Sequence, residues 1–276
     1  MNIGIVGLGL IGGSLAKAIR KNTEHQVWGL DQDPTVLAKA KMVGAIDKEL
    51  SPEDFISCDF LIIATYPKDV TRFLEEKGHL LNPKGLVMDC SGVKEEICLD
   101  AFLLAKKYGF TFVGGHPMAG IEFSGFDASN IKLFKNASMI LTPLPDIQIA
   151  QLEFLKNLFL AIGFSHIEIS TPGKHDKIIA LSSQLAHIVS SAYVQSPSAL
   201  EHSGFSAGSF HDMTRVAELN EILWSQLFFA NRENLINEVD GLIDRLKGYS
   251  KALKDKDEEG LYRLLHQGKV RRIELK

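Results

Sequence analysis

The first sixteen residues constrain the fold more than any other part of the chain. They contain five glycines and no charged residue. Residues 2–6 form an apolar run of strand length, and residues 14–19 continue in a helical pattern after Gly7, Gly9 and Gly12. The segment therefore predicts a strand, a tight turn and a helix. We do not expect a secretion signal, because no basic residue precedes the run and no small-residue cleavage pattern follows it.

The spacing Gly7-x-Gly9-x-x-Gly12 is typical of a dinucleotide-binding turn. The first glycine allows the turn, the second lets the backbone approach a pyrophosphate, and the third lets the helix pack on the strand. The start of the helix adds unpaired N–H groups and the positive end of the helix dipole. The residues assigned to cofactor binding are Gly7, Leu8, Gly9, Leu10, Ile11, Gly12, Asp31 and Thr65.

Asp31 indicates which dinucleotide binds. It stands 19 residues after Gly12, at the end of the second expected strand. A carboxylate there accepts hydrogen bonds from ribose hydroxyls and repels a 2′-phosphate, and the neighbouring Gln32 and Asp33 add no positive charge. NAD is therefore the expected cofactor and NADP the less favoured one. The alternative is that Asp31 only begins the loop.

Seven apolar runs predict a sheet, and helical segments separate them. Near-continuous apolar strands that alternate with helices are typical of a parallel sheet covered on both faces. The strand signals end near Ser170, where residues 170–173 have the turn chemistry of a domain boundary. We expect an α/β protein: a Rossmann-type doubly wound parallel sheet in a dinucleotide-binding domain (residues 1–171), followed by an all-helical dimerisation domain (residues 172–276). The expected strands are residues 2–6, 26–30, 60–64, 86–89, 110–113, 139–141 and 166–169.

Two features of the helical half require burial. Residues 178–200 lack charged side chains and are long enough to span a bilayer, but six serines, two glutamines, a histidine and a proline indicate a buried helix with a polar side. A small domain buries such surfaces most easily against a second copy, so a homodimer through these helices is expected. The second feature is an apolar stripe at spacings of three and four, made of Leu235, Val239, Leu242, Leu246 and Tyr249.

Composition narrows the possible partners and location. A net charge of -4 and a pI near 6.1 favour neither a nucleic acid nor an anionic membrane surface as partner. The three cysteines are odd in number and lack C-x-x-C spacing, which argues against a disulfide framework and fits a reducing cytoplasm. The nine histidines form no H-E-x-x-H pattern, so no metal site is expected.

A second glycine-rich segment carries a histidine. Residues 114–120 follow an expected strand and should lie at the carboxyl edge of the sheet, where doubly wound folds bind ligands. His116 can there accept a proton from a hydroxyl while hydride leaves the carbon beneath it, because an imidazole titrates near working pH. Taken alone, a loop histidine is more often structural or solvated than catalytic.

Four segments resemble the prephenate dehydrogenase family of tyrosine biosynthesis. They are GGHPMAGIEFSGF (114–126), DCSGVK (89–94), HDKIIALSSQLAH (175–187) and HDMTRVAELNEILW (211–224), in the family's order and spacing over nearly the whole chain. The resemblance implies an NAD-dependent oxidative decarboxylation of prephenate. Hydride leaves the ring carbon that bears the hydroxyl, and the ring carboxylate departs as carbon dioxide. The product, 4-hydroxyphenylpyruvate, is aromatic, which supplies the driving force.

The resemblance also implies roles for individual residues. His116 occupies the catalytic histidine position, and Ser91 the position of a serine that hydrogen-bonds to this histidine or to the hydroxyl. Arg215 occupies the position of the carboxylate-binding arginine, whose fork-shaped guanidinium suits that partner. Trp224 matches a position near the pocket, with a core aromatic as the alternative. The expected substrate-binding residues are Arg215, His187, Ser183, Gln184, Asp212 and Trp224.

Local spacing agrees with part of this assignment. Ser183 and His187 are four residues apart and so share one helix face, with Gln184 beside them. Asp212 lies three residues before Arg215 and can orient it, or can form a plain surface ion pair with it. The pair 175–176 (His-Asp) is expected to be a structural pair or a loop anchor. The expected core side of the uncharged helix consists of Ile178, Leu181, Leu185 and Ile188.

Two positions depart from the family pattern. Gln184 stands where many relatives carry a second histidine, and Ile121 where many carry threonine or serine. Both lie near the expected substrate, so arogenate, which has an amino-acid side chain in place of the pyruvyl group, remains an alternative. A dehydrogenase of small β-hydroxy acids is disfavoured, because no lysine falls on the polar face of the uncharged helix. The alternative from another functional class is a non-catalytic NAD sensor, which would not explain the presence of His116, Ser91 and Arg215.

Overall fold

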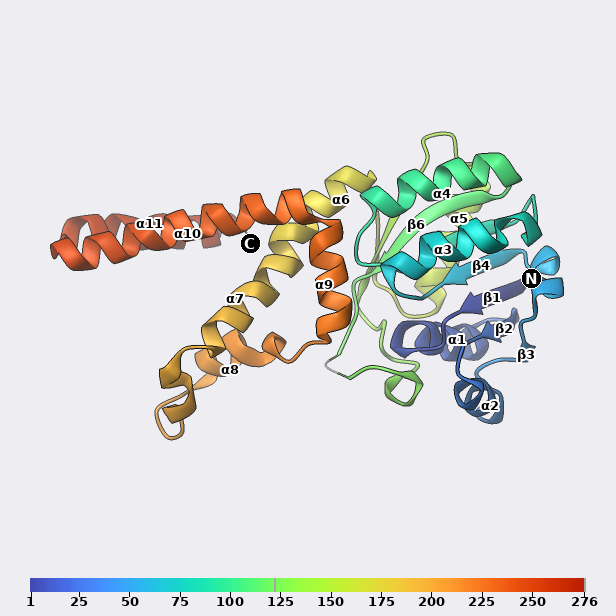
Figure 1. The fold of residues 1–276 in the computed structure, drawn as a ribbon, viewed down its shortest axis with the longest axis horizontal. Helices are drawn as coiled ribbons and strands as arrows, with labels where there is room; N and C mark the ends of the chain where they lie inside the picture. The colour runs from blue at the N-terminus through green and yellow to red at the C-terminus, as the bar shows by residue number, and fades with distance from the viewer. Residues whose placement is uncertain (122, 276) are drawn as a thin grey trace.

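The computed structural model describes residues 1–121 and 123–275. Eight strands form one sheet in the order β3-β2-β1-β4-β5-β6-β7-β8 (Figure 1). Seven of them coincide with the expected strands to within a few residues, and the two-residue β3 at the sheet edge is the one that the sequence pattern does not predict. The strands are β1 (Asn2–Val6), β2 (Gln26–Leu30), β3 (Lys48–Glu49), β4 (Phe60–Ile63), β5 (Leu86–Asp89), β6 (Thr111–Pro117), β7 (Ser138–Pro143) and β8 (His166–Ile169).

The sheet is parallel except at one pair of strands. β6 and β7 run antiparallel, with His116 opposite Ile140, so the expected doubly wound parallel sheet contains one antiparallel pair that the sequence does not predict. The reason is the connection, because a parallel neighbour requires a long crossover, usually a helix. Between β6 and β7 the described residues form only the short 3-10 helix Phe126–Ala128, so the chain turns back beside β6.

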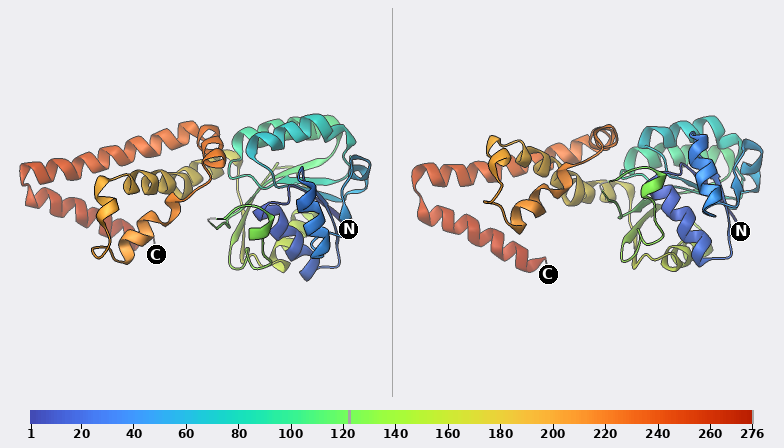
Figure 2. Two further views of the ribbon diagram at one scale, coloured as in Figure 1. Left: turned by 60° about the horizontal axis from the view of Figure 1, so that its bottom comes forward. Right: turned by 90° about the horizontal axis from the view of Figure 1, so that it is seen from below.

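Helices cover both faces of the sheet (Figure 2). Side chains along β1 alternate between two cores, because successive residues of a strand point to opposite faces: Ile5 packs in the first core and Val6 in the second. The first core includes residues of α1 (Leu10–Asn22), α2 (Pro34–Met42) and α5 (Ile149–Ala161). The second core includes residues of α3 (Pro67–Lys77) and α4 (Glu95–Tyr108).

The C-terminal part of the chain is helical and extends away from the sheet (Figure 1). The second core continues into it, because Leu227 packs there as a buried member. None of the helices in the described residues combines the length and hydropathy that a membrane crossing requires. The helices are α6 (Pro172–Ile179), a π-helix (Ala180–Gln184), α7 (Leu185–Val194), 3-10 helices (Pro197–Glu201 and Arg215–Ala217), α8 (Gly208–Thr214), α9 (Glu221–Ala230), α10 (Arg232–Asp255) and α11 (Glu258–Glu274).

The π-helix changes the expected core side of the uncharged helix. Leu185 is buried, but Ile178 and Leu181 are 53% and 52% exposed in the single chain. A π-turn contains an extra residue, so it rotates the residues before it relative to those after it. The apolar positions that an ideal α-helix would align on one side are therefore split, and the expectation of one core face is wrong for Ile178 and Leu181 in the single chain.

Candidate active site

The turn after β1 needs two of its three glycines for its own shape. Gly7 has φ +84°, which favours glycine, and its N–H donates to the Leu30 carbonyl at 2.8 Å. A Cβ on Gly12 would lie 1.8 Å from the Gly7 oxygen. A Cβ on Gly9 would have no atom within 4 Å. The second glycine is thus not required by contacts within the chain, and it leaves open surface beside the start of α1.

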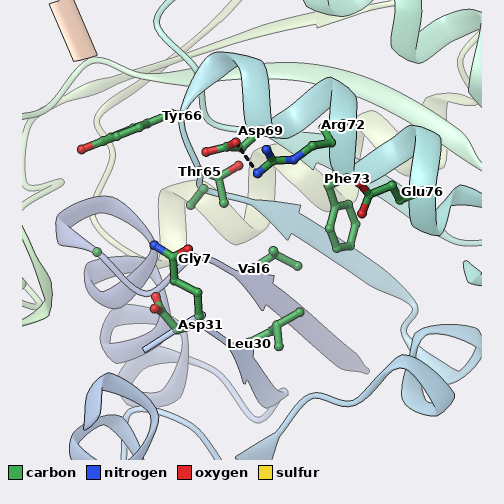
Figure 3. A pocket seen from close by; sticks show the side chains of 13 residues that line it. Val6, Gly7, Leu30, Asp31, Thr65, Tyr66, Asp69, Arg72, Phe73 and Glu76 are labelled. Atoms are coloured by element: carbon green, nitrogen blue, oxygen red, sulfur yellow. Dashed lines mark hydrogen bonds and ion pairs between the residues drawn. The ribbon is translucent and has the colours of Figure 1, made fainter. Parts of the chain in front are cut away.

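Asp31 is tied to this turn. One carboxylate oxygen accepts the Leu8 N–H at 2.7 Å, and the other accepts the Asp33 N–H at 3.0 Å. A cavity of about 450 Å³ lies alongside (Figure 3). Arg72, the one basic side chain that lines it among the described residues, is paired with Asp69 at 2.7 Å. The lining residues are Val6, Gly7, Gly9, Leu30, Asp31, Gln32, Ala64, Thr65, Tyr66, Asp69, Arg72, Phe73 and Glu76.

The eight residues expected to bind a cofactor divide into two sets. Gly7, Gly9, Asp31 and Thr65 line the cavity, and the Thr65 hydroxyl oxygen is buried without a hydrogen-bond partner in the described part of the chain. The other four lie outside the lining. Leu8 points into the first core and Gly12 packs against the turn, while Leu10 and Ile11 form the half-exposed first turn of α1. No side chain caps that turn.

Ser91 and His116 lie close together because Ser91 follows β5, His116 lies near the end of β6, and these two strands are parallel neighbours. Ser91 comes two residues after the end of β5, and His116 lies near the end of β6. The Ser91 N–H donates to the Asp89 carboxylate at 2.8 Å. Its hydroxyl oxygen is buried, with no partner among residues 1–121 and 123–275. A Cβ on Gly92 would lie 3.7 Å from His116 Nε2, so this loop lies against the Nε2 side of the imidazole.

A second histidine and an aspartate stand behind His116. His116 Nδ1 lies 2.8 Å from His175 Nε2, and His175 Nδ1 lies 2.6 Å from Asp176 Oδ1. Asp176 also accepts the backbone N–H groups of Lys94 and Glu95, each at 2.8 Å. The pair expected to be only a structural or loop anchor therefore also contacts the candidate catalytic histidine. The adjacent His-Asp pair is visible in the sequence, but its contact with a residue 59 positions away is not.

The hydrogen bonds define how His116 is protonated. Asp176 is an acceptor, so His175 Nδ1 carries a proton and, in the neutral ring, His175 Nε2 is an acceptor. His116 Nδ1–H then donates to it, which leaves His116 Nε2 as a free acceptor. Burial lowers the pKa of His116 well below its usual value, and the electrostatic effects of His175 and Lys94 lower it further. The His116 imidazole is therefore neutral at working pH.

The helical half presents a second histidine site. The ring of His187 lies over Trp224 with centroids 3.7 Å apart and planes at 30°, and its Nδ1 donates to the Ser183 carbonyl at 2.9 Å. Burial lowers the pKa of His187; the Ser183 carbonyl opposes this shift and the positive charge of Arg215 reinforces it. Trp224 also packs against the second core. Four of the expected substrate-binding residues are therefore grouped around this ring.

The remaining two expected substrate residues lie differently. Gln184 is 1% exposed, and its amide donates to the Leu227 carbonyl at 3.2 Å and accepts from Asn231 at 2.8 Å. Asp212 is exposed. Leu227 contacts both histidine sites. Its carbonyl accepts the Gln184 amide, and its side chain would lie 3.2 Å from a Cβ on Gly92, in the loop beside His116. No cluster of metal-ligating side chains occurs in the described residues.

Fold and site together define a nucleotide-binding α/β protein with a helical second half and a buried, hydrogen-bonded histidine at the sheet edge. Residues 15–168 match the family model described as "Prephenate dehydrogenase, nucleotide-binding domain", and residues 171–267 match "Prephenate dehydrogenase, dimerization domain". The chain belongs to the prephenate dehydrogenase family.

Similar proteins agree with this assignment. The chain is 32% identical to the prephenate dehydrogenase of Bacillus subtilis over an alignment of 278 positions, which covers 96% of this chain and 73% of the relative. A structure of the Aquifex aeolicus prephenate dehydrogenase with hydroxyphenyl propionate and NAD+ matches with a TM-score of 0.87 and 28% identity, over 100% of this chain and 98% of that one. The Synechocystis arogenate dehydrogenase matches with a TM-score of 0.84 and 27% identity over the full length of both.

Proposed function

We propose that the chain is an NAD-dependent prephenate dehydrogenase that converts prephenate to 4-hydroxyphenylpyruvate by oxidative decarboxylation. The observation that carries the proposal is the hydrogen-bonded series Asp176–His175–His116, which leaves a neutral acceptor nitrogen beside the Ser91 loop. Family membership supports the same reaction. It also argues against the alternative of a small β-hydroxy acid dehydrogenase.

The residues present fit NAD. The open surface at Gly9 and the uncapped first turn of α1 suit a pyrophosphate, and the unpartnered Thr65 hydroxyl offers a polar contact inside the cavity. The Asp31 carboxylate suits ribose hydroxyls and disfavours the 2′-phosphate of NADP. When bound, the nicotinamide supplies the hydride acceptor. Leu8, Leu10, Ile11 and Gly12 support this site through the shape of the turn.

His116 performs the proton transfer in this proposal. Its Nε2 accepts the proton of the ring hydroxyl as hydride leaves the same carbon, and the hydrogen bonds of His175 and Asp176 hold the imidazole in position. Loss of the ring carboxylate as carbon dioxide then makes the ring aromatic. The proton returns from His116 to the phenolic oxygen, so the histidine is neutral again. Ser91 offers its hydroxyl to His116 or to the substrate oxygen.

The helical site holds the rest of the substrate. We propose that Arg215 binds a substrate carboxylate, and that His187, Ser183 and Trp224 line the pocket around the ring. Gln184 acts on this pocket through its hydrogen bond to the Leu227 carbonyl rather than through an exposed face. Asp212, one helical turn from Arg215, remains a proposed substrate-side residue.

We further propose that the protein is a homodimer through its C-terminal helices and that it works in the cytoplasm. The match of residues 171–267 to a dimerisation domain supports the dimer, and so do the exposed apolar side chains of α10 and α11. The free thiols of the three cysteines fit a reducing compartment, and burial raises the pKa of Cys58 and Cys98 to about 12. The proposed division between the domains is after residue 171.

Steady-state assays test the proposed reaction. The purified protein is given prephenate or arogenate, each with NAD or NADP, while NADH or NADPH formation is followed and the product is identified by chromatography. We expect turnover of prephenate with NAD to 4-hydroxyphenylpyruvate. A preference for arogenate would show that Gln184 and Ile121 change the substrate, and no turnover of either would favour an NAD-binding sensor.

A further inference from the structure

A buried ion pair that the proposed reaction does not use lies next to the catalytic residues. Lys94 Nζ pairs with the Asp89 carboxylate, and both side chains are 0% exposed. Lysine is almost never fully buried unless it is paired, because removing its charge from water is costly. Replacing such a pair by apolar residues is often neutral or stabilising, so stability alone is a weak reason for its presence.

Asp89 holds the two segments that carry the chemistry. One of its carboxylate oxygens accepts the Ser91 N–H at 2.8 Å as well as the Lys94 ammonium. The other accepts the N–H of Gly115, the residue before His116, at 3.2 Å. A single side chain at the end of β5 thus sets the backbone positions next to both Ser91 and His116.

Lys94 connects this carboxylate to the residues behind His116. Its backbone N–H donates to Asp176 Oδ1 at 2.8 Å, the same oxygen that lies 2.6 Å from His175 Nδ1. Its side chain packs under β6, because a Cβ on Gly114 would lie 3.0 Å from Lys94 Cδ and 2.2 Å from the Thr142 hydroxyl. The lysine has little room to take another position.

We propose that the Lys94 side chain is a positioning group for the reaction and acts through Asp89 on Ser91 and His116, while the backbone N–H of the same residue holds Asp176 behind His175. The role rests on the proposed function. Lys94 is completely buried, so it does not reach out to the substrate; it fixes the residues that do. The titratable groups around His116 are then His175 from α6, with Asp176 behind it, and the Lys94–Asp89 pair from β5 and the following loop.

Two variants separate positioning from stability. Lys94→Met removes the charge and every hydrogen bond of the ammonium but leaves the Asp89 carboxylate buried without its partner, which can unfold the protein. Asp89→Asn/Lys94→Met removes both charges, so no unpaired charge stays buried. Lys48→Met is the matched control, because Lys48 pairs with Asp54 at 2.7 Å in the edge strand β3 of the same domain.

We expect kcat for prephenate to fall by up to about 100-fold in both Lys94 variants, with KM little changed, because small misplacements of reacting groups have effects of this size. Lys48→Met should retain the kcat of the parent protein. The proposal is overturned if the folded double variant keeps a kcat within twofold of the parent value.

A second measurement does not require turnover. The pKa of His116 is followed by NMR in protein labelled at the histidine ring carbons, with His116→Asn used for assignment and the His175 signal tracked alongside. Loss of the Lys94 charge should raise the pKa of His116, because this charge is one of the causes that lower it. An unchanged value in folded Lys94→Met would contradict the proposal even if prephenate proves not to be the substrate.

Discussion

At the scale of single residues, the chemistry of His116 depends on what surrounds it. Burial and the electrostatic effects of His175 and Lys94 keep the imidazole neutral, and the hydrogen bond to His175 directs the free lone pair to Nε2. His187 is neutral for a related reason, because burial also lowers its pKa. The two histidines of the site therefore share a protonation state, although one faces the sheet edge and the other lies over Trp224.

The pH dependence of kcat/KM tests directly whether these neighbours lower the pKa of His116. Because the pKa of His116 is lowered, the base stays unprotonated as the pH falls through 6.5, and activity should decline only at lower pH. His175→Asn removes one of the causes of the shift, so the acidic limb should move to higher pH, with kcat reduced about 10- to 100-fold by the lost orientation. An acidic limb at the same pH in both proteins would show that His175 does not set the pKa of His116.

At the scale of elements, the first turn and the π-helix place the groups of the two sites. The turn needs Gly7 and Gly12 for its geometry, whereas Gly9 is free of contacts. The π-helix Ala180–Gln184 joins α6, which carries His175, to α7, which carries His187. One continuous helical segment thus supplies a histidine to each part of the site.

Two glycine variants separate the fold from cofactor binding. Gly12→Ala forces a Cβ against the Gly7 oxygen, and we expect it to destabilise the protein by about 1–3 kcal/mol, the usual cost of overpacking. Gly9→Ala meets no atom of the chain, so its unfolding midpoint in urea should match that of the parent protein while its affinity for NAD falls. Equal NAD affinity in Gly9→Ala would show that the dinucleotide does not approach this backbone.

The sequence predicts the elements better than their connections. Apolar runs identify seven strands, because a strand buried on both faces must be apolar along its length. The antiparallel direction of β7 is not predicted, because an apolar run looks the same for a parallel and an antiparallel strand. The only sign of it is that no long helix connects β6 to β7 among the described residues. The π-helix is also not predicted, because residues 178–188 fit an ideal helix equally well by composition.

At the scale of the whole molecule, the hairpin of α10 and α11 projects beyond the rest of the chain (Figure 2). α10 buries only Leu235 and Ala252 in the single chain, and α11 buries none of its described residues. The stripe predicted from the sequence is only partly covered, with Leu246 56% exposed. So much exposed apolar surface on one part of a molecule is typical of an interface.

Light scattering after size exclusion tests the homodimer. We expect a mass of about 61 kDa, twice the 30.5 kDa of one chain. Leu253→Glu on α10, where the side chain is 64% exposed, should shift the mass toward the monomer, whereas Leu99→Glu on α4, 65% exposed, should not. A monomeric parent protein, or a dimer equally insensitive to both changes, would refute an interface at these helices.

The site itself was only partly predictable at this scale. The resemblance to the family predicts His116, Ser91, His187 and Arg215, but the sequence does not show that His175 touches His116. That contact depends on how α6 docks on β6 across 59 residues, which no local pattern encodes. The buried position of Gln184 likewise follows from the packing of α9 and α10 against the π-helix.

The most direct test of the central claim is the kcat of His116→Asn with prephenate and NAD, measured together with its NAD affinity. His166→Asn is the matched control, because this histidine is exposed on β8 and pairs only with Glu168 among the described residues. We predict a loss of kcat of about 100-fold or more in His116→Asn, the scale of general base catalysis, with unchanged NAD affinity and a control that behaves like the parent protein. Full activity of His116→Asn would contradict the assignment of His116 as the base.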